Sequence, residues 1–266
     1  MDIKRMLTGS GFWIAGLIGC AAILLSAAWP KEWDALECGA SFLLWQDALP
    51  SKLVVYVLPA CGVLPYADSY LQEWQTGFLR SYMSRINRRE YIRGKVISMT
   101  LAGFLSWTAA ALMAGMILFF LIYPYEMRSD LWNAAAGIAG RMGTQSGMAL
   151  EPLAGTYTEM FWNLAITIAR IGLLSSILGN LSAVCAQLCR STYMAYGLPF
   201  VVWYMLIILK ERYFEQLYYI YPAEWVNPGN HWGGSSCWGL WLLLLLMDLG
   251  ITMLNGAMIA GRLEEI

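Results

Sequence analysis

"VISMTLAGFLSWTAAALMAGMILFFLIYP", residues 96–124, is a run of 29 residues without a charged side chain. A helix needs about 20 predominantly apolar residues to cross the hydrocarbon core of a bilayer. This run exceeds that length, so we expect the helix to tilt or to project beyond the membrane. The stretch predicts a helical fold built inside a lipid bilayer.

The composition of the whole chain agrees with that prediction. Of its 266 residues, 59% are hydrophobic and only 13% are charged, whereas soluble domains carry about 25% charged residues. The 13 Trp and 15 Tyr suit a bilayer, because their amphipathic rings favour the headgroup zone. The formal net charge of −1 gives no reason to expect nucleic acid as a partner.

Six segments predict membrane spans, and together they make residues 1–266 a single all-α transmembrane domain. The second is the weakest, because it contains Pro59, Pro65 and Asp68, and Pro199 predicts a kink in the fifth. The first has features of a cleaved signal peptide, a positive start and a "LSAA" end, but its length favours an uncleaved span. The expected spans are residues 12–29, 53–71, 96–124, 160–188, 193–209 and 238–260.

The distribution of Lys and Arg predicts the orientation of these spans. With the N-terminus inside, the cytoplasmic segments hold ten Lys and Arg residues and the outer loops hold six. Most acidic residues fall in the outer loops. We therefore expect a multi-pass membrane protein with both termini in the cytoplasm.

The basic residues concentrate in one cytoplasmic segment, residues 72–95. Its second half, "SYMSRINRREYIRGK", has five Arg or Lys among fifteen residues and one acidic residue. "EWQTGFLRSYMSRI" predicts an amphipathic helix on the inner membrane surface that ends near Asn87 and is placed to meet a cytoplasmic partner. The alternative is a solvated loop that only fixes the topology. The apolar stripe of this helix comprises Phe78, Leu79, Tyr82, Met83 and Ile86.

The sequence lacks the residues of most membrane enzymes, so we predict no catalytic residue and no metal or cofactor site. The single His, His231, stands in a Gly-rich turn, and Cys185 and Cys189 have no His or carboxylate beside them. A phosphate-binding G-x-x-x-x-G-K-[ST] loop is absent from the sequence, so any ATP must be bound by a partner. Cys38 and Cys237 fall in predicted outer loops, and whether they pair stays open.

Two charged residues fall inside predicted spans, where charge is costly and is typical of functional sites. Arg170 lies ten residues after Met160 and Asp248 ten residues after Trp238. We expect them at similar depth, as an ion pair or in a shared polar cavity near the middle of the bilayer. The alternative is that each meets the interface or a backbone carbonyl separately.

The segment "DSYLQEWQTGFLRSYMSRINRREYIRGK", residues 68–95, resembles the permease subunits of bacterial type-2 ABC exporters. It is similar to the E-x-x-x-G pattern of that family, followed by a basic, Tyr-containing start of the third span. The short basic N-terminal segment, the six spans and the aromatic, Pro-containing loop before the last span extend the resemblance over the whole chain. The long loop over residues 125–159 departs from it. The matching residues are Glu73, Gly77, Arg88, Arg89, Tyr91, Gly94 and Lys95.

This resemblance implies a function and a set of partners. The N-terminal helix would lie at the inner leaflet of the bacterial plasma membrane, and the segment between spans two and three would hold a coupling helix that docks into a separate ATP-binding subunit. Two permease chains, identical or paralogous, would form an export pathway with two such subunits. The substrate stays open. The coupling contact would be made by Glu73, Gly77, Arg80, Arg85 and Arg88.

A different class of function also fits the sequence. The chain would then be a non-transporting accessory, sensory or immunity membrane protein that binds a peptide or a partner through its outer loops. An intramembrane enzyme is disfavoured by the lack of catalytic residues in the sequence.

Overall fold

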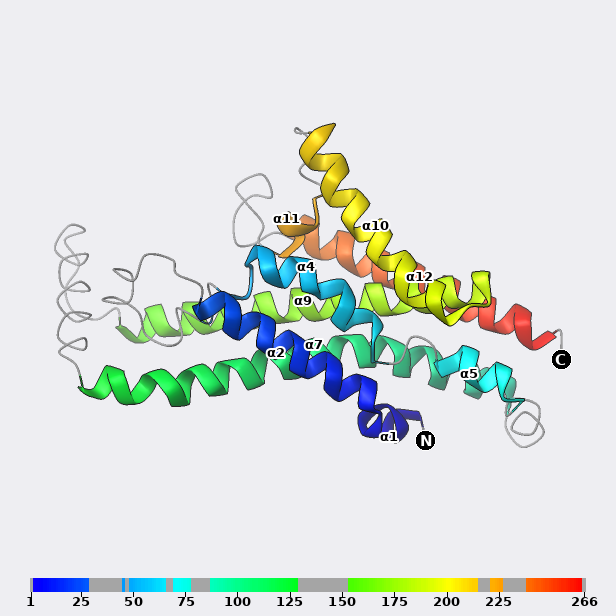
Figure 1. Ribbon diagram of the computed structural model, residues 1–266, viewed down its shortest axis with the longest axis horizontal. Helices are drawn as coiled ribbons and strands as arrows, with labels where there is room; N and C mark the ends of the chain where they lie inside the picture. Colours follow the sequence, from blue (N-terminus) through cyan, green and yellow to red (C-terminus); the bar gives the residue numbers. More distant parts are fainter. Residues whose placement is uncertain are drawn as a thin grey trace.

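The structure is a computed structural model, and it describes residues 2–28, 45, 48–65, 69–77, 87–128, 153–214, 221–226 and 238–264. Within these residues every regular element is a helix, so the expected all-α fold is confirmed there (Figure 1). The helices are α1 (Asp2–Thr8), α2 (Ser10–Ala28), α4 (Lys52–Val63), α5 (Ser69–Gln75), α7 (Arg88–Arg128), α9 (Leu153–Cys189), α10 (Thr192–Arg212), α11 (Pro222–Val226) and α12 (Trp238–Glu264).

Five of these helices, α2, α7, α9, α10 and α12, are long and apolar enough to cross a membrane. They fit a multi-pass membrane protein and coincide with five of the six predicted spans. Helix α9 packs against α4, α7, α10 and α12 and so occupies the centre of the bundle. Both chain termini lie at the same end of it (Figure 1).

The second predicted span, residues 53–71, is wrong as a continuous membrane helix. Helix α4 ends at Val63 after 12 residues, which gives about 18 Å of rise against the roughly 30 Å of a hydrocarbon core. The chain turns at Leu64 and Pro65, because Pro65 has no N–H with which to continue the hydrogen-bond ladder. Helix α5 then begins separately at Ser69.

Two of the long helices begin earlier than hydropathy predicts. Helix α7 starts at Arg88 rather than at residue 96, because the Asn87 side chain accepts a hydrogen bond from the backbone N–H of Arg89 at 3.2 Å and caps the first turn. Helix α9 starts at Leu153 rather than at residue 160. Hydropathy locates the apolar part of a helix, whereas capping and polar turns decide where the helix begins.

Small residues let α4 and α7 approach α9 closely at one level of the bundle. A Cβ atom added to Gly103 would lie 2.7 Å from the carbonyl oxygen of Ser175, and one added to Gly62 would lie 2.9 Å from the same atom. These distances are shorter than any ordinary contact, so only glycine fits at either position. Small residues are the usual means by which helices pack tightly within a bilayer.

Two prolines lie inside helices, and a neighbouring helix satisfies the carbonyl that each leaves without a donor. Pro59 has no N–H for the carbonyl of Val55, and Trp203 Nε1 of α10 donates to that oxygen at 3.0 Å. Pro199 likewise has no N–H for the carbonyl of Ala195, and this oxygen accepts a hydrogen bond from Ser182 Oγ of α9. Side-chain donors from a neighbouring helix allow proline to occur inside a helix within the membrane.

Candidate functional site

The carboxylate of Glu73, on α5, is bonded to three other side chains. The residue is 4% exposed. Its Oε1 accepts hydrogen bonds from Arg5 Nη1 at 2.8 Å and from Lys95 Nζ at 2.9 Å, and its Oε2 accepts from Tyr91 Oη at 2.7 Å. We call Arg5, Glu73, Tyr91 and Lys95 the Glu73 cluster; it joins α1, α5 and α7.

Helical spacing and apolar packing place these side chains together. Tyr91 and Lys95 are four residues apart on α7, so they lie on one face of that helix. Met6 of α1 is fully buried in the same apolar cluster as Tyr91, and Trp74 of α5 packs against it. The apolar contacts therefore bring three helices to one point, and the charged groups bond there in surroundings with little water.

The two cations of the cluster differ in burial. The side chain of Lys95 is 0% exposed, whereas that of Arg5 is 58% exposed. Removing one partner of a buried ion pair costs about 3–5 kcal/mol, because it leaves an uncompensated charge, whereas an exposed ion pair contributes about 0–1 kcal/mol. We therefore expect the bond between Glu73 and Lys95 to contribute most to stability. The bond from Arg5 links Glu73 to α1 and is exposed to solvent.

The structure describes three of the five residues expected to couple to an ATP-binding subunit. Glu73 is buried, and its carboxylate bonds Arg5, Tyr91 and Lys95 of its own chain. Gly77 has φ of +70° and follows the end of α5 at Gln75. The expected helix over residues 73–86 is therefore wrong at this point, because the left-handed backbone of Gly77 ends a helix. Arg80 and Arg85 lie outside the described residues.

The third coupling residue, Arg88, contacts a different helix. Its Nη2 donates to the carbonyl oxygen of Ala260, near the C-terminus of α12. Arg262 Nη2 similarly donates to the carbonyl oxygen of Gln187, near the C-terminus of α9, at 2.8 Å. A guanidinium group at a helix C-terminus complements both the unpaired carbonyls and the helix dipole. These two contacts fasten α7 to α12 and α12 to α9 at the end of the bundle that holds the termini.

The structure does not bring Arg170 and Asp248 into contact. Asp248 Oδ1 accepts a hydrogen bond from Ser176 Oγ at 3.0 Å, while Arg170 Nη2 donates to Thr167 Oγ1 at 3.3 Å. The ion pairs within the described residues both end on Glu73. Asp248 lies level with Ser176, six residues beyond Arg170 along α9, which is about 9 Å of rise. In the described residues, each of the two side chains therefore meets a hydroxyl group of α9 rather than the other charge.

Sequence reasoning missed a run of hydrogen-bonded side chains between α7, α9 and α12, which we call the polar ladder. Asn180 Nδ2 donates to Thr100 Oγ1 at 3.0 Å and to Thr252 Oγ1 at 3.2 Å. Asn255 Nδ2 donates to Asn180 Oδ1 at 3.3 Å, and Gln187 Nε2 donates to Asn255 Oδ1 at 2.7 Å. The available signal was the recurrence of amide and hydroxyl residues on one face of α9 and on one face of α12.

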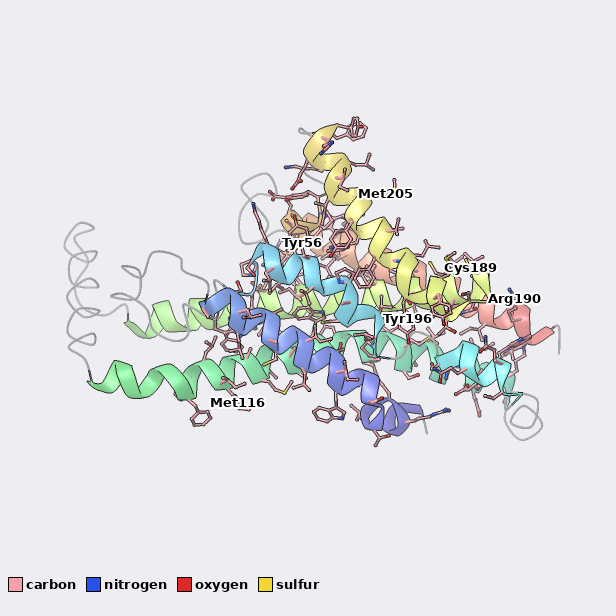
Figure 2. The ribbon with its side chains drawn as sticks, in the orientation of Figure 1. Tyr56, Met116, Cys189, Arg190, Tyr196 and Met205 are labelled. Atoms are coloured by element: carbon pink, nitrogen blue, oxygen red, sulfur yellow. The ribbon has the colours of Figure 1, made fainter. Side chains whose placement is uncertain are left out.

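The remaining candidates carry no site in the part of the chain that the structure describes. Cys185 and Cys189 are free thiols, and Figure 2 shows Cys189 beside Arg190 at the junction of α9 and α10. No group of three or more His, Cys, Asp or Glu residues that could hold a metal ion occurs among the described residues. His231, Cys38 and Cys237 lie outside them.

The fold and the site together define a class: an all-helical chain with five apolar helices that fit a multi-pass membrane protein, and a buried ionic cluster at the end that holds both termini. Comparisons of the chain with protein-family models, with curated proteins and with solved structures gave no match.

Proposed function

We propose that the chain is the permease subunit of a bacterial type-2 ABC exporter, which forms an export pathway driven by separate ATP-binding subunits. One observation carries the proposal: the pair of Glu73 and Lys95, at 2.9 Å. Glu73 lies on α5 and Lys95 on α7, so the two residues lie near opposite ends of the basic segment, residues 72–95. The buried pair therefore holds the two ends of that segment together.

Because its two ends are bonded to each other, we expect residues 73–95 to move as one unit when a partner pushes on them. A subunit that docks on Arg80 and Arg85 and moves would displace both ends of the segment together, because separating Glu73 from Lys95 would expose two charges inside the protein. The displacement would pass directly into α7, which continues from Lys95 as a helix long and apolar enough to cross a membrane. Arg88 would carry it to α12, and Arg5 to α1.

The proposal specifies the partners and the location. The functional unit comprises two permease chains, identical or paralogous, and two ATP-binding subunits, which supply the ATP site. The permease itself is not an enzyme and interacts with the lipid bilayer and not with nucleic acid. It lies in the bacterial plasma membrane with both termini in the cytoplasm, so that the Glu73 cluster faces the cytoplasmic leaflet.

The test is co-purification with the ATP-binding subunit encoded by a neighbouring gene. Arg80→Glu and Arg85→Glu reverse charges on the expected docking segment, and each is expected to weaken association about tenfold or more. Arg212→Glu is the matched control, because it makes the same charge reversal at an exposed arginine that ends α10, far along the chain from the segment. We expect this control to bind like the unchanged chain.

Two outcomes would contradict the proposal. Full association of both Arg80→Glu and Arg85→Glu would remove the coupling role of the segment. Failure of the unchanged chain to associate with any ATP-binding subunit would remove the permease assignment, and would favour an accessory, sensory or immunity protein.

A further inference from the structure

Asp248 has an unusual position for a carboxylate. Of the three acidic residues in the five candidate spans, Glu90 and Glu211 lie within a turn of a span end, whereas Asp248 lies ten residues after its span begins and fifteen before it ends. It is half-buried on α12, a helix that packs against α9 and α7 with one face and exposes the other. Ionisable residues in the interior of a membrane span are rare and commonly functional.

A hydrogen bond from α9 holds the carboxylate of Asp248 in place. Ser176 Oγ donates to its Oδ1 at 3.0 Å. Thr252, one turn further along α12, is held by Asn180 of the polar ladder at 3.2 Å. The surroundings of the carboxylate are therefore fixed by bonds to α9 and α7.

The described chain supplies no countercharge to Asp248. Both ion pairs among the described residues end on Glu73. Arg170 lies six residues from Ser176 along α9, which is about 9 Å of rise. A charged carboxylate inside a bilayer is stabilised by a cation close by, so a cation that binds here would come from outside this part of the protein.

The side chains around Asp248 also suit an apolar ligand. Leu245 and Leu249 flank it on α12 and are 55% and 56% exposed, and Trp241 lies two turns earlier on the same side of the helix. Aromatic rings attract organic cations, and a pocket or surface that binds amphiphiles usually combines apolar area with a few polar anchors.

We propose that Asp248 is the anionic anchor of a binding site for lipophilic cations, molecules with a quaternary or protonated amine on an apolar body, which reach it from within the bilayer. The inference rests on the proposed transport function and names the substrate class of that function. The carboxylate pairs with the cationic centre, and the exposed leucines of α12 contact the apolar body.

The test is equilibrium binding of tetraphenylphosphonium to the purified full-length chain in detergent, with tetraphenylborate as a probe of the same shape and opposite charge. We expect saturable binding of the cation and none of the anion. Asp248→Asn should weaken binding of the cation about tenfold or more. Glu90→Gln is the matched control, because it neutralises a carboxylate in the first turn of α7, and should leave binding unchanged.

Equal binding of the two probes, no saturable binding of tetraphenylphosphonium, or unchanged binding by Asp248→Asn would overturn the proposal. If Asp248→Asn fails to fold, Asp248→Glu retains the charge and should retain the preference for the cation, and the comparison of the two probes on the unchanged chain decides independently. No ATP-binding subunit is present in this assay. A negative result therefore leaves the co-purification experiment standing, and the reverse also holds.

Discussion

At the scale of single residues, two cations that look alike in the sequence differ in burial and therefore in how much they stabilise the protein. Arg5 and Lys95 both bond Oε1 of Glu73, at 2.8 and 2.9 Å, yet one is largely exposed and the other fully buried. Water compensates the loss of an exposed charge but not of a buried one. The energetic role of a charged residue at this site therefore follows from its burial and not from its charge.

Substitution of the two cations tests this difference. Lys95→Met leaves Glu73 buried without its internal countercharge, and we expect the free energy of unfolding to fall by about 3–5 kcal/mol. Arg5→Met, the matched control at the same carboxylate oxygen, should lower it by less than about 1 kcal/mol. Thermal or denaturant unfolding of the purified chain measures both values.

The double variant Glu73→Gln/Lys95→Met provides the second arm of this test. It removes both buried charges, so we expect it to recover a large part of the stability that Lys95→Met loses. Equal losses from Lys95→Met and Arg5→Met would contradict the assignment of Lys95 as the structural partner.

The burial of Glu73 also shows where sequence reasoning stops. The E-x-x-x-G pattern drew attention to Glu73 and Gly77, but it did not show that the carboxylate of Glu73 points inward. That direction depends on Tyr91 and Lys95, which stand one helical turn apart on a helix that begins eleven residues after Gly77. A local motif does not encode such a pairing.

At the scale of elements, proline and small residues determine how helices adjoin. Helix α10 bonds α4 through Trp203, which donates to Val55 O, and through Tyr204 Oη, which donates to the carbonyl oxygen of Tyr56 at 2.9 Å. Tyr56 lies where α4 adjoins α10 (Figure 2), and its ring stacks on that of Tyr204. The position of α10 against α4 is therefore set by specific donors as well as by apolar area.

Trp203→Phe tests the bond at Pro59. The variant keeps an aromatic ring but removes the N–H, so the buried carbonyl of Val55 loses its donor, and we expect a loss of about 1–3 kcal/mol in the free energy of unfolding. In a Pro59→Ala background the restored N–H of residue 59 can bond Val55 within α4, and the loss should shrink. Trp162→Phe is the control, because Trp162 is 68% exposed.

A loss that is the same in both backgrounds would show that Trp203 acts through its packing alone. Unfolding curves for the four combinations of residues 59 and 203 give the coupling between the two sites directly.

Elements also differ in how far the sequence predicts them. The five candidate spans follow from local hydropathy, which a single sequence contains, and their existence was predicted correctly. The early end of α4 was not, although Pro65 was noted in the second predicted span, because the apolar run that precedes Pro65 continues through Tyr66 and Ala67. The polar ladder was missed for another reason: Asn180 and Asn255 are single amides in apolar runs, and only the pairing of α9 with α12 makes them partners.

At the scale of the whole molecule, three charged contacts between helices gather at one end. The Glu73 cluster, the contact of Arg88 with α12 and the contact of Arg262 with α9 all lie where the chain termini lie (Figure 1). The polar ladder lies inside the bundle, and Asp248 lies half-buried on α12 beside exposed leucines. The two proposals use different regions: the terminal end receives movement from an ATP-binding subunit, and the side of α12 around Asp248 contacts the transported molecule.

The most direct test of this account is the accessibility of residue 80. Arg80→Cys, in a chain whose native cysteines are replaced by serine, is labelled with a membrane-impermeant maleimide in sealed cells and in inside-out vesicles. The account predicts labelling only in the inside-out vesicles, and protection from the label when the ATP-binding subunit is added. Labelling of residue 80 from outside sealed cells would contradict it, because the segment closed by Glu73 and Lys95 would then face away from any ATP-binding partner.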